Sequence, residues 1–319
     1  MSTTLNSGID PASFSAVTGP AQDLFRYVNG PWIDMYRLPD DRSRYGSFDK
    51  LAEDAENQIR EILEDDDCPA EKSHALYASF LDVDAINASG LAAIEDQLKA
   101  IDVAADKAEL TRSLGAMNPA GGPDLIGIAV YGDPGAPETN IIHIEQSGLG
   151  LPDEAYYRED HYAPIREAYV DMVAKQLKNA KLAADDEQAE AQAQRFLDVE
   201  TRIAANHWDN VATRDSVKTY NPTDYAELSG MLADYDLDTW IESWQSAYDQ
   251  TSAAQVQPLD FRGIFNHVVV HEPSFLTGLN AFWKAADLDD LKLWARVHVI
   301  IGSTLELPHE FDETNFEFY

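Results

Sequence analysis

Histidine and glutamate side chains are the first residues of this sequence that could do chemistry, because a helical His-Glu-x-x-His segment can hold zinc. In such a segment two imidazoles share one helix face, and the glutamate serves as a general base. The pair His-Glu occurs twice, but the fifth residue is Phe275 after His271 and Glu313 after His309. Neither site completes the motif. We therefore predict that this chain contributes no catalytic residue and no metal ligand of its own.

His267 and His271 also stand four residues apart, with three valines between them. The valines favour a strand. The two imidazoles would then share a face but lie about 13 Å apart along it, too far for bonds of about 2 Å to one ion. An independent metal site at His267 and His271 therefore stays a minor hypothesis. The other histidines are assigned to ordinary surface or core positions.

Other catalytic arrangements are incomplete. The sequence has no Gly-x-Ser-x-Gly elbow, and Cys68 stands among acidic residues that disfavour the reactive thiolate. Gly121-Gly122 lacks the following Lys-Ser/Thr of a phosphate-binding loop. Acidic pairs are so frequent that none stands out as a catalytic dyad. The tryptophans at helical spacing are predicted to be core residues: Trp208, Trp240, Trp244 and Trp283.

The composition is strongly acidic, with 57 Asp and Glu against 23 Lys and Arg and a net charge of -34. Such a chain repels phosphate backbones and anionic lipids, so we expect neither nucleic acid nor a membrane as a partner. Hydrophobic residues make up 45% of the sequence, which separates it from disordered acidic chains. Its 319 residues are enough for one large domain or two.

Targeting signals are also missing from the printed sequence. The single cysteine, Cys68, allows no intramolecular disulfide, as is usual in a reducing compartment. Residues 1–20 contain no apolar run of signal-peptide length, and no window is apolar enough to span a bilayer. We expect a cytoplasmic protein.

Hydrophobic periodicity predicts a mainly α fold with a small β element. Residues 125–131 and 140–146 alternate around a Pro- and Gly-containing turn and predict a β-hairpin. Residues 267–271 predict a short strand, and 1–20 an extended arm. Helices are expected at 23–36 with a break at 29–31, and at 47–64, 71–86, 91–101, 107–115, 164–182, 185–205, 221–231, 238–248, 273–286, 288–303 and from 308 to the last residue.

Two stretches near the N-terminus are dense in aromatic residues, Gly, Pro and Arg. They read Asp23-Leu24-Phe25-Arg26-Tyr27-Val28-Asn29-Gly30-Pro31-Trp32 and Ser43-Arg44-Tyr45-Gly46-Ser47-Phe48-Asp49. From composition alone they predict a helix cap and turn that pack aromatic rings onto a helical core. The alternative is that the segment holds Arg44 to meet a carboxylate.

Together these stretches resemble the N-terminal signature of the neprilysin-like zinc metallopeptidases, which include neprilysin, the endothelin-converting enzymes and bacterial oligopeptidases. Gln146-Ser147-Gly148-Leu149-Gly150-Leu151-Pro152 resembles the family's turn after its hairpin. Three later segments are also similar to the family: the valines before Pro273, the helix from Trp294 to Ile301, and Asn315-Phe316. The resemblance covers about residues 20–319.

The resemblance implies the N-terminal, non-zinc half of such an enzyme. Residues 1–50 would be an arm and signature segment near the catalytic domain, and 51–319 a helical cap that encloses the active-site cavity and limits substrates to small peptides. Arg44 would bind the substrate's C-terminal carboxylate, for which a guanidinium is well suited. Some members carry a second arginine where this chain has Ala52, which puts a dipeptidyl preference in doubt.

The family's zinc motif and its substrate-binding Asn-Ala motif belong to a second half that is missing here. Asn280-Ala281 matches the latter by coincidence. We expect zinc in the full-length enzyme, no peptidase activity from this chain alone, and a catalytic half and small peptides as partners. Because the last residues are apolar and the pattern of the last helix is unfinished, we also expect self-association through the truncated face. The alternative is a stand-alone helical module that binds peptides or proteins without catalysis.

Overall fold

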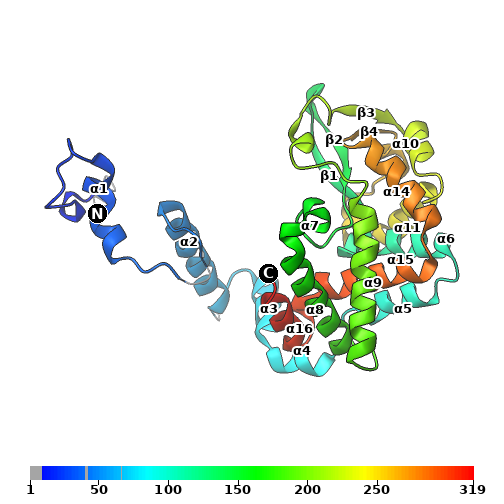
Figure 1. The fold of residues 1–319 in the computed structure, drawn as a ribbon, viewed down its shortest axis with the longest axis horizontal. Helices are drawn as coiled ribbons and strands as arrows, with labels where there is room; N and C mark the ends of the chain where they lie inside the picture. The colour runs from blue at the N-terminus through cyan, green and yellow to red at the C-terminus, as the bar shows by residue number, and fades with distance from the viewer. Residues whose placement is uncertain (1–8, 40–41, 66) are drawn as a thin grey trace. The chain divides into compact units, whose positions relative to one another are not determined.

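A computed structural model of the chain describes residues 9–39, 42–65 and 67–319 (Figure 1). Residues 1–8 of the expected N-terminal arm lie outside that description. The chain divides into two compact units, Met1–Ser79 and Phe80–Tyr319, and each is described by itself. The fold is mainly helical with one small sheet, as predicted. Within the described ranges, no helix is both long and apolar enough to cross a membrane.

The first unit contains a 3-10 turn at Pro11–Ser13, then α1 (Leu24–Met35) and α2 (Ser47–Glu64), and it ends within α3 (Glu71–Leu81). The predicted break at Asn29-Gly30-Pro31 is wrong, because α1 runs through Pro31. Proline has no N–H for the carbonyl four residues earlier. That carbonyl, of Tyr27, instead accepts a hydrogen bond of 2.7 Å from the N–H of Ser15, so the segment before the helix replaces the missing donor.

The single helix expected over 71–86 is two helices, α3 and α4 (Val83–Ser89). Asp82 lies between them, and its carboxylate accepts a 3.0 Å hydrogen bond from the N–H of Ala85. A short acidic side chain favours such an N-cap over a helix interior. The apolar periodicity continues across the cap, which is why the pattern alone missed the break.

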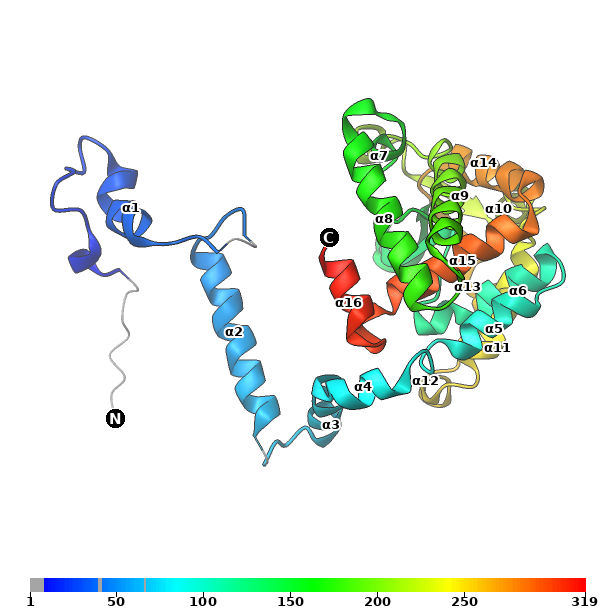
Figure 2. The same cartoon turned by 60° about the horizontal axis from the view of Figure 1, so that its bottom comes forward.

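Helices make up most of the second unit (Figures 1 and 2). They are α5 (Glu95–Val103), α6 (Lys107–Met117), α7 (Ala155–Arg158), α8 (Ala163–Asn179), α9 (Asp186–Ala204), α10 (Tyr225–Met231), α11 (Leu237–Tyr248), α12 (Ser252–Val256), α13 (Phe261–Ile264), α14 (Pro273–Ala285), α15 (Leu288–Gly302) and α16 (His309–Phe316), with 3-10 turns at Asn118–Ala120, Asp160–Tyr162, Ala212–Arg214 and Thr304–Glu306. Asp185 caps α9 by accepting from the N–H of Gln188.

A shared core joins these helices. The helix α15 packs against α5, α8 and α9, and α6 packs against α11. The largest fully buried side chains include Trp240, Trp283, Trp294, Tyr169 and Phe196. Two of the four tryptophans assigned to the core are thus buried. Trp244 is half-buried, and Trp208 lies nearer the surface, where its indole N–H donates to the hydroxyl of Ser274.

A sheet of four strands lies at the end of this unit away from α4 and α16 (Figure 1). Its order is β1 (Ile126–Asp133), β2 (Ala136–Gln146), β4 (His267–Val270) and β3 (Asn221–Asp224). The hairpin β1–β2 and the strand β4 were predicted. The pairs β1–β2 and β3–β4 are antiparallel, whereas β2 and β4 are parallel. Parallel pairing between strands this far apart in sequence leaves no local signal.

The helix expected to open at residue 221 begins later, because Asn221–Asp224 forms the edge strand β3 and α10 starts at Tyr225. An edge strand tolerates Pro222, since one side of it needs no N–H donors. The last helix also differs from expectation. It ends at Phe316, after which Phe318 packs on Tyr169 and the hydroxyl of Tyr319 donates to the carbonyl of Gly150 at 3.0 Å.

The loop after β2, residues 146–151, is held by side chains from distant elements; we call it the clamped loop. Glu272 accepts from the N–H of Gln146, His207 Nε2 lies 3.0 Å from the carbonyl of Ser147, and Trp294 Nε1 donates to the carbonyl of Gly148. Two glycines are required. Gly148 has φ of +94°, and a methyl group on Gly150 would lie 1.9 Å from the hydroxyl oxygen of Tyr169.

The deepest partner of the clamped loop is Glu200 of α9, whose side chain is fully buried. Its carboxylate accepts from the N–H of Gly150 at 2.8 Å and from the hydroxyl of Tyr157 at 2.9 Å, and it lies 2.9 Å from Nε2 of His298. Burial next to this carboxylate raises the pKa of Tyr157, so the phenol stays a donor. A buried carboxylate is tolerable because it is fully hydrogen-bonded.

The substitution Glu200→Gln should lower the free energy of unfolding by about 2–4 kcal/mol. In the variant, the N–H groups of the glutamine amide would point at a donor that binds a carboxylate oxygen in the unmodified chain. Urea unfolding followed by tryptophan fluorescence would measure the loss. Glu190→Gln, at an exposed position of the same helix, is the matched control and should change little. Equal stability of the two variants would contradict the role given to Glu200.

Glu272 predicts a pH effect. Burial raises the pKa of its carboxyl to about 7 in the folded chain, above its value of about 4.3 in an unfolded one. The folded state therefore holds the proton more tightly, and Glu272 makes the chain less stable as pH rises from about 4 to about 7. Glu272→Gln should stabilise the chain at about pH 8 by about 1–3 kcal/mol and have little effect at about pH 4. Urea unfolding at both pH values checks this, with Glu138→Gln as an exposed control.

Candidate functional site

The segment around Arg44 is built from the aromatic residues of the first unit. Trp32 of α1 and Tyr36, which directly follows that helix, stack with ring centroids 4.7 Å apart, and Tyr36 stacks on Tyr45 at 4.6 Å. The rings stack on one another and not on a helical core, because Trp32 is still 43% exposed and Phe48 is 87% exposed, so the packing predicted from composition is wrong. The stack joins the end of α1 to the chain just before α2 and so fixes the backbone on the C-terminal side of Arg44.

Glu53, on the second turn of α2, holds the residues on both sides of Arg44. It accepts from the hydroxyl of Tyr45 at 2.6 Å and pairs with Arg42 at 3.2 Å. The hydrogen bond to Glu53 raises the pKa of Tyr45. Arg42 also lies over the ring of Tyr45. Neighbours of Arg44 are therefore fixed by one carboxylate, whereas Arg44 itself takes no part in this arrangement.

Arg44 is exposed, and its guanidinium has no hydrogen-bond or ion-pair partner among the described residues. Ala52, where some relatives of this type would carry a second arginine, is exposed on α2. An unpaired guanidinium on a fixed backbone can bind a carboxylate through two parallel hydrogen bonds. The geometry is thus compatible with the binding role predicted for Arg44.

The histidines weighed as metal ligands do not converge. His267 begins β4 opposite Asp224, whereas His271 follows the other end of that strand. Nε2 of His271 lies 2.8 Å from Nδ1 of His143 on β2, and its Nδ1 lies 3.7 Å from Glu145. Burial lowers the pKa of His271. This pair was not predicted, because it depends on the parallel pairing of β2 and β4.

No group of three or more His, Cys, Asp or Glu side chains in the described part of the chain is arranged to hold a metal ion. The donor sets therefore do not fit zinc. Glu272 is used by the clamped loop, and the N–H of His309 donates to Asn87. Asn280 caps the turn at Asp234 by accepting from its N–H at 2.7 Å, so its side chain is occupied by the fold itself.

The clamped loop is the part of the molecule that residue-type reasoning missed. Glu200, which contacts this loop, and His298, which contacts Glu200, did leave a signal. Glu200 stands on the apolar stripe of its helix with Phe196 and Ile203, and His298 interrupts a run of valines and isoleucines. A charged residue at a core position predicts a buried polar contact. The identity of the partner cannot be read from the stripe.

Comparison with known proteins supplies the family. The sequence model of the family described as "Peptidase family M13" matches residues 20–319. Human neprilysin is 25% identical over 91% of this chain and 42% of neprilysin. Endothelin-converting enzyme 1 of Cavia porcellus is 23% identical over 96% of this chain and 40% of that enzyme. The chain thus spans less than half the length of these curated relatives.

Solved structures agree with the sequence comparison. The zinc metalloprotease ZMP1 of Mycobacterium tuberculosis, solved with an inhibitor, aligns with a TM-score of 0.82 and 33% identity over 98% of this chain and 46% of that protein. PepO of Lactobacillus rhamnosis shares the fold, with a TM-score of 0.69 at 19% identity. The predicted resemblance to neprilysin-like peptidases is confirmed. The chain belongs to peptidase family M13.

Proposed function

We propose that this chain is the N-terminal, non-zinc part of a zinc-dependent peptidase that hydrolyses short peptides. The family match over residues 20–319 carries the proposal, and the likeness to a zinc metalloprotease supports it. More than half of each of these relatives has no counterpart in this sequence. Since the donor sets described above do not fit zinc, we assign the metal to a catalytic half with which this chain acts.

We propose further that residues 51–319 form a cap over the substrate cavity of the complete enzyme. The second unit suits this role because its core is continuous and its clamped loop is tied to three helices, α7, α9 and α15, to Glu272 at the N-cap of α14, and to Tyr319. A rigid wall encloses a cavity of fixed size. Such a wall would admit short peptides and exclude folded proteins.

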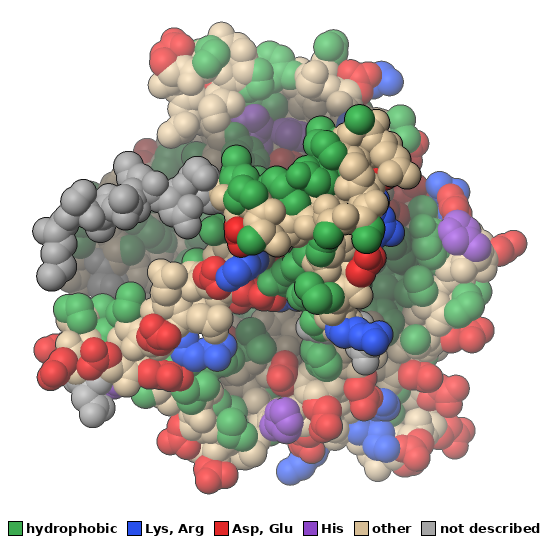
Figure 3. Space-filling model, turned by 90° about the vertical axis from the view of Figure 1, so that its left-hand side faces the viewer, with side chains coloured by type: hydrophobic (Ala, Val, Ile, Leu, Met, Phe, Trp, Pro, Cys, Tyr) green, Lys and Arg blue, Asp and Glu red, His purple; other side chains and the backbone are tan. Residues whose placement is uncertain are grey.

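The exposed apolar face of α2 supports a role for the first unit in contacting another protein surface. Phe48, Leu51, Ile59 and Ile62 repeat at helical spacing and are 87%, 62%, 56% and 54% exposed, and none of the described residues of α2 is buried. Figure 3 shows acidic side chains (red) spread across one face of the molecule, with Lys and Arg (blue) among them. An exposed apolar face on a helix favours a partner. We propose that residues 1–50 and α2 pack near the catalytic half, or on a second copy in its absence.

The proposed function is tested with the purified 319-residue chain and with the protein encoded by the complete reading frame. The chain alone, supplied with zinc, should cleave no quenched fluorescent peptide. The complete protein should cleave it and lose activity with a chelator. Chelator-sensitive cleavage by the 319-residue chain would contradict the assignment of zinc to a separate half.

Arg44 is proposed to bind the C-terminal carboxylate of the substrate. In the complete protein, Arg44→Ala should raise KM for peptides with a free carboxylate by about ten- to a hundredfold, because a charged hydrogen-bond partner is lost. C-terminally amidated peptides should be affected little. Steady-state kinetics on both peptide types makes the measurement.

Arg60→Ala is the matched control for Arg44, because Arg60 is also exposed in the first unit and has no partner among the described residues. It should leave both KM values unchanged. An equal effect of Arg44→Ala on free and amidated peptides would exclude carboxylate binding by this residue, whatever the outcome for the peptidase as a whole.

The alternative function is a stand-alone module that binds a protein without catalysis, and the apolar face of α2 favours it equally. The reading frame distinguishes the two. A coding sequence that runs on into His-Glu-x-x-His supports the peptidase. A stop codon directly after the codon for Tyr319 supports the module.

A further inference from the structure

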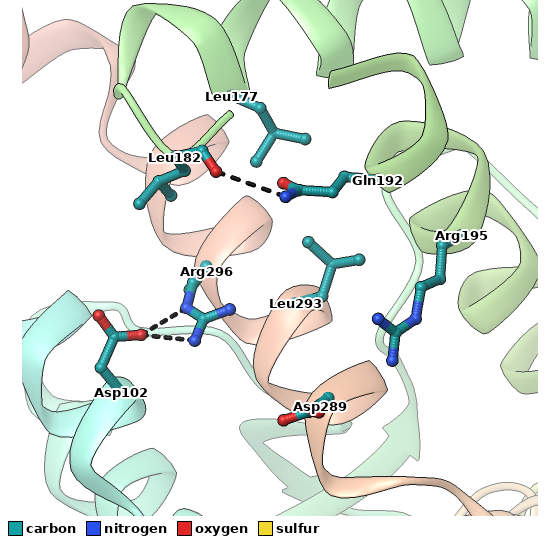
Figure 4. A pocket seen from close by; sticks show the side chains of 8 residues that line it. All are labelled: Asp102, Leu177, Leu182, Gln192, Arg195, Asp289, Leu293 and Arg296. Carbon is teal, nitrogen blue, oxygen red and sulfur yellow. Dashed lines mark hydrogen bonds and ion pairs between the residues drawn. The ribbon is translucent and has the colours of Figure 1, made fainter. Parts of the chain in front are cut away.

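A surface cavity of about 350 Å³ opens in the second unit between α5, α8, α9 and α15 (Figure 4). This volume lies in the range of small-molecule sites. The cavity combines leucines with two arginines, and no step of the proposed function uses it. Its lining residues are Asp102, Leu177, Leu182, Gln192, Arg195, Asp289, Leu293 and Arg296.

The two guanidinium groups are each held on one edge only. Nε and Nη2 of Arg296 both bind Asp102 at 2.6 Å, and Nε of Arg195 binds Asp290. Nη1 of Arg296 and both terminal nitrogens of Arg195 have no partner among the described residues. Figure 4 shows the two groups on either side of Leu293. The aspartates thus orient the arginines and leave N–H donors at one cavity.

Apolar side chains lie between these charges. Leu177 and Leu293 are almost fully buried, and Leu182 is half-buried against the core. Leu177 and Leu293 reach the cavity only with small parts of their side chains, so the more exposed Leu182 offers the larger apolar surface for an aliphatic group. Asp289, which lines the same cavity, is exposed and has no ion-pair partner in the described ranges. Its carboxylate is free to meet a cation, such as the ammonium group of an amino acid.

The charge of the whole chain makes this cavity unusual. With a net charge of -34, most of the surface repels small anions. Arg195 and Arg296 are each paired with an aspartate and Asp289 also lines the cavity, so the open N–H donors, and not a net positive charge, would attract a carboxylate there. Planar guanidinium groups match carboxylates in shape and hydrogen-bonding pattern. A ligand that satisfies the cavity therefore has a carboxylate next to an aliphatic group.

We propose that this cavity binds an aliphatic α-carboxylate, with the carboxylate on Arg195 and Arg296 and the side chain on Leu177, Leu182 and Leu293. A free amino acid such as leucine and the C-terminal residue of a short peptide share this chemistry. In a free amino acid the ammonium group would meet Asp289. The inference rests on the cavity alone and stands whether or not the chain serves a peptidase.

Isothermal titration of the purified 319-residue chain with N-acetyl-L-leucine, L-leucine, glycyl-glycyl-L-leucine and L-leucinamide tests the proposal. The carboxylates should bind, and the amide, which lacks the carboxylate, should bind at least about tenfold more weakly. Tighter binding of leucine than of the other two carboxylates would identify the free amino acid as the ligand. Tighter binding of the tripeptide would identify the peptide C-terminus.

Arg195→Gln and Arg296→Gln should each weaken binding by about tenfold. Arg202→Gln is the matched control, because Arg202 also pairs with Asp290, at 3.5 Å, but does not line the cavity. This variant should leave binding intact. Unfolding curves show whether each variant is folded. Asp289→Asn, at an exposed position, should weaken the binding of leucine but not that of N-acetyl-leucine. The proposal is overturned if no carboxylate binds at about 10 mM, if the amide binds equally well, or if both cavity arginines are dispensable.

Discussion

The structure depends on a charge that is buried and fully hydrogen-bonded. Glu200 lies inside the second unit and accepts from a backbone N–H and a phenol, with an imidazole nitrogen within hydrogen-bond distance. A carboxylate in this position is costly unless every partner is present, so α7, α9, α15 and the clamped loop must be in register at the same time. The apolar core brings these elements together, and Glu200 selects one arrangement among those the core would allow.

Much of the helical fold could be predicted from apolar periodicity, because most helices of the second unit bury one stripe against a shared core. The errors occur where a single polar residue or a proline acts against that pattern. Pro31 lies inside a helix because Ser15 replaces the lost donor, and Asp82 divides a helix by capping its second part. Asn221 begins a strand because β4 is available to pair with it. Each outcome depends on a partner that a local window does not contain.

The candidate site was predictable to a different degree. Residue types alone offered carboxylate binding by Arg44 only as an alternative, and the family resemblance made Arg44 the candidate site residue. The structure adds that Glu53 holds both its neighbours and leaves its guanidinium unpaired. The histidine pair His143 and His271, the clamp on residues 146–151 and the arginine cavity were out of reach of sequence reasoning, since each joins elements that are distant in the chain.

The parallel pairing of β2 with β4 also governs the order in which the molecule can be completed during synthesis. The hydrogen bond of Gln146 can form only after Glu272, 126 positions later, has been synthesised. Those of Gly148 and Gly150 form later still, since they need Trp294 and Tyr319. On the ribosome the hairpin therefore emerges with an open strand edge and an unsupported loop. Contacts of such long range form slowly and leave edges exposed to aggregation. The second unit reaches its final shape only after Tyr319 has been made.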